Sequence, residues 1–292
     1  MALELRNSKV AVIGLGAIGS PVAVNLAKKG ISVEVWNRSE IATEKAVSAG
    51  AMRVSSLSEI DAAIVLTALP DLSQVQSVLH AGLKNALKKG DILVVMGTVS
   101  PVAIKVLGKE LNNDGIHLVD APVSGGDVGA QNGTLSIMVG STTEEFETLL
   151  PTFSLVGETI RHLGPLGAGE MAKACNQIIV AVTLTAIAEA VTLGRRAGLD
   201  THTLLDIFSG GFANSHVLNV KRERIENGDF TPGGSAAFQL KDLRFALEAG
   251  SETGTELPTT QRVTELFEAL INAGDGELDH SSIIKEIQRR AK

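Results

Sequence analysis

A short apolar run that leads into three spaced glycines constrains the fold of this chain most strongly. Residues Lys9–Ile13 are β-branched or apolar after the first lysine, and a helical pattern follows from Ser20 to Ala27. The apolar run predicts a buried parallel strand. In such a strand–turn–helix unit, the first glycine permits a tight turn, the second lets a pyrophosphate approach, and the third allows close helix packing. We therefore predict that this turn binds a dinucleotide and is not merely a connection between a strand and a helix. Its residues are Gly14, Leu15, Gly16, Ala17, Ile18 and Gly19.

The residues after the second expected strand, Ile31–Trp36, indicate which dinucleotide is preferred. In a site that prefers NAD, an acidic residue usually accepts hydrogen bonds from the adenosine ribose at this point. This chain has Asn37 and Arg38 instead. A guanidinium can pair with a 2′-phosphate or stack on adenine, and an amide can donate to the phosphate. The pair therefore favours NADP(H). The alternative is that Arg38 is only a loop cation in an NAD enzyme, and the nearby Glu40 is a weak argument against the NADP(H) preference.

Strand and helix patterns alternate through the first half of the chain, which predicts an α/β fold with a doubly wound parallel sheet. From Met171 onward every periodic segment is typical of a helix. We therefore expect a Rossmann-type NADP-binding domain at 1–163 and an all-helical domain for substrate binding and oligomerisation at 164–292, which begins with a long inter-domain helix. The other expected strands are Ile60–Thr67, Asp91–Val95, Gly115–Asp120, Leu135–Val139 and Ser154–His162, with helices at Leu72–Leu87, Pro101–Asn112 and Glu144–Thr152.

Lys173 is the strongest candidate for an acid–base group. The glycine-rich segment Gly164–Gly169 precedes it, so a helix should begin near Ala168 and place Lys173, Asn176 and Gln177 on one face. A lysine held against apolar surroundings can act as a proton donor, because burial lowers a lysine pKa. A lone lysine at a helix end is more commonly solvated, but the nucleotide signature in the same chain favours the catalytic interpretation. Cys175, within this segment, is expected to be a small buried hydrophobe.

Loops at the carboxyl ends of the expected strands supply the other candidate residues, because ligands of open α/β sheets bind there. Leu69-Pro70 follows one strand and a loop containing Thr98 follows another. A third loop holds Ser124, Gly125 and Gly126, whose hydroxyl and exposed amides can bind an anion such as a carboxylate. A proline-x-serine-glycine-glycine segment is by itself more commonly a turn. Together with the Lys173 face, it is expected to form the opposite wall of a cleft.

The composition limits the class of protein and its surroundings. With 292 residues and a formal net charge of −7, the chain has length for a sizeable core and too little positive charge for a general nucleic-acid grip. Its single cysteine excludes an internal disulfide, which favours the cytoplasm. No signal peptide opens the sequence, and the apolar stretch Ile178–Ala188 is shorter than the ~20 residues that span a bilayer. We therefore expect no membrane association. The histidines lack metal-ligand spacing, so we also expect no catalytic metal.

Four ordered blocks and the tail resemble the β-hydroxyacid dehydrogenases, the family that contains 3-hydroxyisobutyrate dehydrogenase, tartronate semialdehyde reductase and the glyoxylate/succinic semialdehyde reductases. The resemblance covers essentially the whole chain and is specific to the family, though not to one substrate. It implies a Rossmann domain of the 6-phosphogluconate dehydrogenase type, NAD(P)-dependent hydride transfer, and homodimers or homotetramers. The matching segments are Gly14–Gly19, Asp120–Gly126, Gly164–Gln177, Phe238–Leu243 and Asp279–Lys285.

The resemblance also implies roles for individual residues. Lys173 corresponds to the catalytic lysine, and Ser124 with Gly125 to contacts of the substrate carboxylate. Lys241 matches a lysine near the nicotinamide and substrate, and Thr98 a threonine beside the nicotinamide ribose. The family commonly has an asparagine four residues after the lysine, where this chain has Gln177, so either Asn176 or Gln177 is the closer substrate contact. Gly97 replaces a common serine and Val95 a common aspartate, which should affect the ribose-side loop more than the chemistry.

Three functions remain open on the sequence alone. The favoured one is a semialdehyde or glyoxylate reductase. The second is an oxidising dehydrogenase of a larger 3-hydroxy acid or of an amino- or sulfo-substituted relative, and the segment Phe208–Ser215 with Phe238 would decide between the two by lining the pocket. The third is a catalytically silent NADP-binding interaction protein. An imine reductase of similar architecture resembles the chain less, because those proteins tend to replace the lysine.

Overall fold

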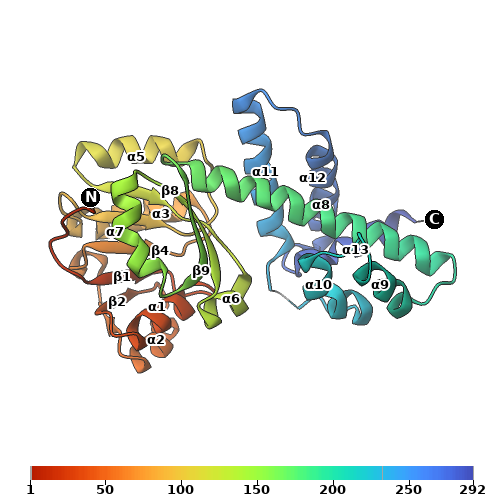
Figure 1. The fold of residues 1–292 in the computed structure, drawn as a ribbon, viewed down its shortest axis with the longest axis horizontal. Coiled ribbons are helices and arrows are strands. Elements are labelled where there is room, and N and C mark those ends of the chain that lie inside the picture. Colours follow the sequence, from red (N-terminus) through yellow and green to blue (C-terminus); the bar gives the residue numbers. More distant parts are fainter. Residues whose placement is uncertain (1, 232, 292) are drawn as a thin grey trace. The chain divides into compact units, whose positions relative to one another are not determined.

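The computed structural model describes residues 2–231 and 233–291. The chain divides into two compact units, Met1–Lys173 and Ala174–Lys292 (Figure 1). The first unit is an open sheet with helices on its faces, and the second is helical. This confirms the predicted fold class. The units divide inside one long helix, whereas the sequence placed the boundary just before that helix.

Within the described ranges, one nine-stranded sheet forms the centre of the first unit. Its order is β3-β2-β1-β4-β5-β6-β8-β7, with β9 paired to β8. All pairs from β3 to β6 are parallel, and the order reverses beside β1, so the carboxyl ends of β1 and β4 flank a switch point where ligands bind in such sheets. The strands are β1 Val10–Ile13, β2 Val33–Trp36, β3 Met52–Arg53, β4 Ile64–Thr67, β5 Ile92–Val95, β6 His117–Asp120, β7 Val123–Ser124, β8 Leu135–Gly140 and β9 Gly157–Gly164.

The two faces of this sheet bury separate apolar cores, because neighbouring strand residues point to opposite faces. Val10 and Val12 of β1 pack in one core, with buried side chains from α1, α2, α6 and α7. Ala11 and Ile13 pack in the other, with side chains from α3 and α5. Figure 1 shows α5 and α1 on opposite sides of the strands. The helices of this unit are α1 Gly19–Lys28, α2 Glu44–Ser48, α3 Leu72–Val78, α4 Lys84–Ala86, α5 Ala103–Asn113, α6 Gly126–Asn132 and α7 Thr143–Phe153.

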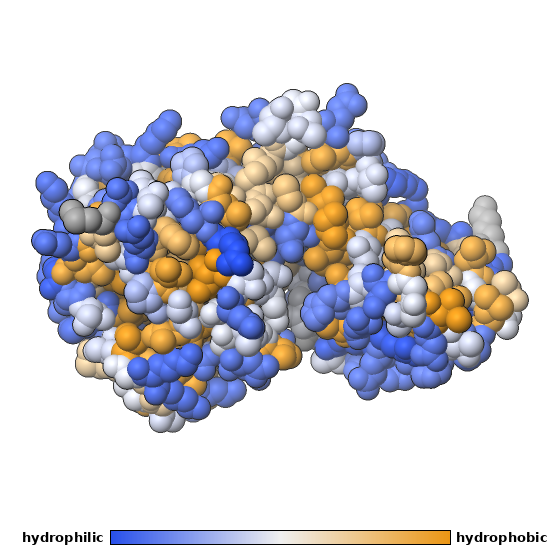
Figure 2. All heavy atoms as spheres, in the orientation of Figure 1, coloured by the Kyte–Doolittle hydropathy of each residue, from blue (hydrophilic) through white to orange (hydrophobic). Residues whose placement is uncertain are grey.

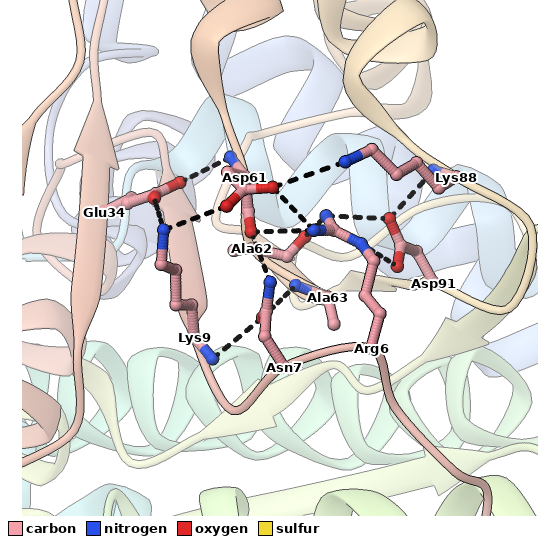
Figure 3. Close-up of polar contacts among 9 residues, drawn as sticks. All are labelled: Arg6, Asn7, Lys9, Glu34, Asp61, Ala62, Ala63, Lys88 and Asp91. Atoms are coloured by element: carbon pink, nitrogen blue, oxygen red, sulfur yellow. Dashed lines mark hydrogen bonds and ion pairs between the residues drawn. The ribbon is translucent and has the colours of Figure 1, made fainter.

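A network of charged side chains ties together the amino ends of β1, β2, β4 and β5 (Figure 3). The Arg6 guanidinium donates from Nε and Nη2 to the buried Asp91 carboxylate at 2.8 and 3.1 Å, and from Nη1 to Asp61 Oδ1 at 2.7 Å. Lys9 bridges Asp61 and the buried Glu34. Hydrogen bonds from Lys9 and Arg6 lower the pKa of Asp61 to about 2. The network fixes the end of the sheet that lies away from the expected ligand site.

The second unit surrounds the distal part of the long helix α8 Ala168–Arg196. Its core contains Leu184 and Val191 of α8 with buried side chains from every later α-helix. By length and composition α8 could cross a membrane, but half of its most apolar window is buried within the protein, as expected for a core helix. The later helices are α9 Thr201–Ser209, α10 His216–Asn227, α11 Ala236–Thr253, α12 Pro258–Leu270 and α13 Ile283–Arg290.

Four details differ from the sequence-based expectations. The two-residue strands β3 and β7 and the short helix α6 were not predicted. Strand β8 runs antiparallel to β6, so the sheet is parallel only in its larger part. The expected helix Leu72–Leu87 is broken where Gly82 has a φ of 130°, which is outside the helical region. Cys175 is exposed, so its prediction as a buried hydrophobe is wrong for the single chain.

Candidate active site

The glycine-rich turn has the shape that a dinucleotide requires. Gly14 has a φ of 88°, and a Cβ there would lie 2.7 Å from the Leu69 side chain. A Cβ on Gly19 would collide with the Gly14 carbonyl oxygen, so α1 packs this closely only with glycine. A Cβ on Gly16 would meet nothing within 4 Å. The backbone at Gly16 therefore borders open space, as the approach of a pyrophosphate demands.

A pocket of about 650 Å³ opens beside this turn. Leu15, Gly16 and Ala17 of the turn line it, together with residues from α1, the turn before α2, α2 itself and α6. Parallel strands place the first turn of the following helix at this edge, where backbone N–H groups favour phosphate oxygens. The residues of the turn thus fit a bound dinucleotide.

Asn37 and Arg38 lie at the carboxyl end of β2, as predicted, but they differ in their freedom to bind a ligand. Asn37 Oδ1 accepts a hydrogen bond from Leu15 N–H at 2.9 Å, and Asn37 Nδ2 donates to the Ser39 carbonyl at 3.0 Å. Asn37 therefore holds the glycine turn against β2 and keeps one amide hydrogen for a ligand. Arg38 is exposed, and no hydrogen bond or ion pair engages its side chain within the described residues.

The loops after β4 and β5 contact each other. A Cβ on Gly97 would collide with the carbonyl oxygen of Leu69, so the Gly97 backbone lies directly on the Leu69-Pro70 loop. This explains why glycine replaces the serine common in the resembling family, because a side chain here would push the two loops apart. Thr98, next in the chain, is half-buried at the same edge of the sheet.

Ser124 ends β7, and Gly125 and Gly126 connect it to α6. Ser124 is half-buried, and both glycines are exposed. Their backbone N–H groups are thus open to solvent at the start of a short helix. Exposed donors of this kind are what the predicted role in holding an anionic group requires.

Asp120 fixes the start of the helix that carries Lys173, which the sequence did not predict. Its two carboxylate oxygens accept hydrogen bonds from the N–H groups of Gly167 and Glu170, each at 2.7 Å. Burial raises the pKa of Asp120 to about 6, although these backbone hydrogen bonds act to lower it. The buried Glu170 carboxylate in turn accepts from Val99 N–H at 3.1 Å. The Asp120 carboxylate therefore joins the end of β6 to the first turn of α8, and the Glu170 carboxylate joins that turn to the Thr98 loop.

Lys173 lies on the second turn of α8 and is only 7% exposed. A lysine is almost never this buried unless its ammonium group has a partner or a function. Asn176 and Gln177 follow on the same helix, one turn later. The predicted patch of three polar side chains on one helix face is therefore present.

The two amides after Lys173 belong to an ordered hydrogen-bond chain in the second unit. Asn176 Nδ2 donates to Gln177 Oε1 at 2.9 Å, and Gln177 Nε2 donates to Asp242 Oδ2 at 2.7 Å. Lys241 Nζ lies 3.2 Å from the other Asp242 oxygen. Because a carboxylate only accepts, it fixes which end of the Gln177 amide faces Asn176. Gln177 is thus held on both sides, while Asn176 is half-buried and keeps its oxygen and one amide hydrogen.

Lys241 lies on α11 between two aromatic rings. Its Nζ is 5.9 Å from the Phe238 ring centre and 5.2 Å from that of Phe245. Cation–π contacts at these distances restrain the ammonium group, and the Lys241 side chain as a whole is 23% exposed. Phe212, in contrast, is fully exposed, so it does not line a pocket of its own unit.

The described ranges contain no cluster of three or more histidine, cysteine, aspartate or glutamate side chains arranged to hold a metal ion. Sequence reasoning missed Asp120, Glu170 and Asp242 as parts of the site, although all three stand inside the recognised blocks. It also missed Arg53, which lines a small pocket with Arg38. The signal for Arg53 was absent, because a two-residue strand has no periodicity to recognise.

Two family models together cover almost the whole chain. Residues 9–164 match the NAD binding domain of 6-phosphogluconate dehydrogenase, and residues 167–287 match the NAD-binding domain of NADP-dependent 3-hydroxyisobutyrate dehydrogenase. These matches coincide with the two parts of the structure that the predicted site residues occupy. They establish that the chain binds NAD(P).

Individual proteins agree with the family models over their full lengths. The 2-hydroxy-3-oxopropionate reductase of Escherichia coli (strain K12) is 38% identical, over 97% of this chain and 98% of the relative. The 2-(hydroxymethyl)glutarate dehydrogenase of Eubacterium barkeri is also 38% identical, over 96% and 95%. The crystal structure of 3-hydroxyisobutyrate dehydrogenase from Salmonella typhimurium has a TM-score of 0.89 at 26% identity and covers 96% of this chain and 99% of that one. With a glycine turn shaped for a dinucleotide and a buried lysine followed by ordered amides, the chain belongs to the β-hydroxyacid dehydrogenases, NAD(P)-dependent oxidoreductases that act on CH–OH groups.

Proposed function

We propose that this enzyme is an NADP(H)-dependent reductase that converts a small semialdehyde or 2-oxo acid into the corresponding β-hydroxy or 2-hydroxy acid. The observation that carries the proposal is the buried Lys173 with the fixed amide pair one turn later on α8. The similarity to a 2-hydroxy-3-oxopropionate reductase supports a short, carboxylate-bearing substrate.

Lys173 acts as the general acid in reduction. When bound, the reduced nicotinamide supplies the hydride that the carbonyl carbon accepts. Lys173 Nζ then gives a proton to the nascent alkoxide oxygen, which completes the alcohol, and the amine regains a proton from solvent. In the oxidising direction the neutral amine removes the alcohol proton. Asp120 keeps the first turn of α8 in place and thereby positions the Lys173 ammonium group, although Asp120 does not itself contact the substrate.

The remaining site residues orient the substrate. Asn176 is the closer amide contact, because Gln177 already uses both ends of its amide. Ser124 and the N–H groups of Gly125 and Gly126 hold the carboxylate, and Lys241 adds a positive charge. Fixed donors of this kind lower the barrier by positioning and by stabilising the developing oxyanion.

Preference for NADP(H) over NAD(H) follows from the groups at the end of β2. Arg38 is exposed and available for a 2′-phosphate, and no acidic residue occupies the position that accepts from the ribose in NAD-preferring sites. Glu40 does not accept hydrogen bonds from the ribose, because its carboxylate pairs with Arg53 at 2.8 Å.

A second candidate is an oxidising dehydrogenase of a larger 3-hydroxy acid. The equal identity to a 2-(hydroxymethyl)glutarate dehydrogenase favours it. The exposed Phe212 gives no support for a pocket narrowed by that aromatic residue within its own unit.

We also propose a cytoplasmic homodimer or homotetramer. Large apolar side chains are exposed on the second unit, where Ile179 and Leu193 of α8 are 66% and 72% exposed and Ile207 of α9 is 71% exposed. Figure 2 shows apolar patches among hydrophilic side chains on one face of the molecule. A second copy could cover them, and light scattering coupled to gel filtration measures the assembly.

Consumption of NADPH and of NADH tests the proposed activity, with glyoxylate, succinic semialdehyde, 2-hydroxy-3-oxopropionate and methylmalonate semialdehyde as substrates. Lys173→Ala should lower turnover by ~10²–10⁴ and leave cofactor affinity nearly unchanged. Lys109→Ala, on the exposed side of α5, is the matched control and should behave as wild type. Equal loss of cofactor binding in Lys173→Ala would contradict the acid–base role. Faster oxidation of a 3-hydroxy acid than reduction of any member of the panel would favour the second candidate.

A further inference from the structure

A small pocket of about 140 Å³ lies at the carboxyl ends of β2 and β3 in the first unit. The two strands are parallel neighbours, with Val35 opposite Arg53, so their last residues meet at the same edge. A water molecule occupies about 30 Å³ of liquid, so the pocket has room for a phosphate group. Its lining residues are Trp36, Asn37, Arg38, Glu40, Thr43, Arg53, Val54 and Ser55.

The charged groups of this pocket favour an anion. Arg38 and Arg53 bring two positive charges, and Glu40 brings one negative charge. Arg53 Nη1 donates to Glu40 Oε2 at 2.8 Å. The Glu40 side chain is 75% exposed and that of Arg53 is 46% exposed. Ion pairs this open to water contribute little to stability, so an incoming anion of higher charge can displace the glutamate.

The Glu40 side chain can also move away from Arg53 without disturbing the backbone around it. Glu40 opens a 3-10 turn, Glu40–Thr43, and its backbone carbonyl accepts a hydrogen bond from Thr43. The turn is therefore held by backbone and hydroxyl contacts that do not involve the Glu40 carboxylate. Arg53, in contrast, extends from a strand whose register is fixed by β2.

We infer that Arg53 is a second contact for the 2′-phosphate of NADP(H) and that Glu40 occupies its guanidinium when no phosphate is bound. This inference rests on the proposed preference for NADP(H) and names a residue that contributes to it. A 2′-phosphate lies between Arg38 and Arg53 and displaces Glu40. NAD(H) lacks the 2′-phosphate, so the Arg53–Glu40 pair stays intact when it binds. Arg53 thus strengthens binding of one cofactor only, and Glu40 weakens binding of that same cofactor.

Two small ligands isolate the phosphate contribution without turnover. Adenosine 2′,5′-bisphosphate and adenosine 5′-monophosphate differ only by the 2′-phosphate. Their dissociation constants are measured by calorimetry and by the fluorescence of Trp36, which lines the pocket and is the single tryptophan of the chain. The variants are Arg53→Ala, Arg53→Lys and Glu40→Gln. Arg262→Ala is the matched control, because Arg262 forms a similarly exposed pair with Glu265 on α12.

Arg53→Ala should weaken the bisphosphate about tenfold or more and change the monophosphate less than about twofold, since a hydrogen bond to a charged group is lost. Arg53→Lys should recover part of the loss, and Glu40→Gln should tighten the bisphosphate alone. Arg262→Ala should change neither.

The inference is overturned if Arg53→Ala binds the bisphosphate as tightly as wild type, or if it weakens both ligands equally. If wild type itself binds the two ligands equally, the proposed NADP(H) preference fails, and the inference fails with it. A wild type that prefers the bisphosphate, beside an Arg53→Ala variant that keeps the full preference, removes only the role of Arg53.

Discussion

The Gln177 side-chain amide donates to the buried Asp242 carboxylate at 2.7 Å and thereby sets the orientation of its neighbour Asn176. An isolated amide could bind in either of two orientations, because its oxygen and nitrogen ends have nearly the same shape. The carboxylate removes that freedom, since it accepts from Gln177 Nε2 and leaves Gln177 Oε1 for Asn176. The orientation of the proposed substrate contact is therefore decided two side chains away.

Exchanging the hydrogen-bonding character of this pair provides a direct test. Gln177→Glu places two carboxylates together and should lower kcat/KM by about 10- to 100-fold, because a buried polar link is broken. The double variant Gln177→Glu with Asp242→Asn restores a donor opposite an acceptor and still presents an oxygen to Asn176. We expect it to recover most of the lost activity. A double variant no better than Gln177→Glu would show that the chain does not position Asn176.

Two glycine substitutions should separate ligand binding from folding. Gly16→Ala adds a methyl group where the protein leaves open space, so the free energy of unfolding should stay within about 1 kcal/mol of wild type. Its affinity for NADPH and for NADH should fall together, because the methyl group occupies the path of the pyrophosphate. Gly19→Ala should instead destabilise the first unit, because its Cβ collides with the Gly14 carbonyl. Urea unfolding and cofactor titration measure both effects, and a Gly16→Ala variant with normal cofactor affinity would contradict the proposed cradle.

The parts of this site that the sequence predicted are the parts encoded locally. The glycine turn sits between an apolar strand and a helix, and Lys173 with its amides is spaced by single helical turns, so neighbouring residues define both. The alternation of strands and helices likewise predicted the parallel sheet as far as β6. Strand β8 could not be predicted as antiparallel, because its apolar pattern is the same in either direction.

The features that the sequence did not predict depend on contacts between segments that are distant in the chain. Asp120 acts on the start of α8 through Gly167 and Glu170, which are 47 and 50 residues later in the chain. Arg53 reaches the β2 pocket only because a two-residue strand pairs there. Cys175 was expected inside the protein because a free cysteine is commonly a small buried hydrophobe, yet it is exposed. Residue type alone carries no signal for such pairings.

The Arg6 network should contribute strongly to the stability of the first unit. Arg6→Ala removes two hydrogen bonds from the Asp91 carboxylate, which is 1% exposed and would keep a backbone donor from Lys88. Loss of one partner of a buried ion pair costs on the order of 3 kcal/mol. Arg6→Lys keeps the charge but not the forked geometry of the guanidinium. Its free energy of unfolding should therefore lie between those of wild type and Arg6→Ala. Urea unfolding followed by Trp36 fluorescence measures the change, and an unaltered midpoint for Arg6→Ala would refute the role.

Asp279 should make the stability of the helical unit depend on pH. Burial acts to raise the pKa of Asp279, but the charge of His280 and hydrogen bonds from Lys221 and Ser281 outweigh it and lower the pKa from 3.8 to about 2. Because the folded pKa lies below the unfolded value, the stabilisation is complete above pH 4–5 and is lost as pH falls through about 2. Its size is about 2 kcal/mol, from 1.36 kcal/mol per unit of pKa. Asp279→Asn should therefore be less stable than wild type by about this amount at pH 6, and the difference should shrink as pH falls toward 2. Denaturant unfolding followed by circular dichroism measures both proteins across this range, and a difference that stays constant with pH would show that the Asp279 charge does not stabilise the fold.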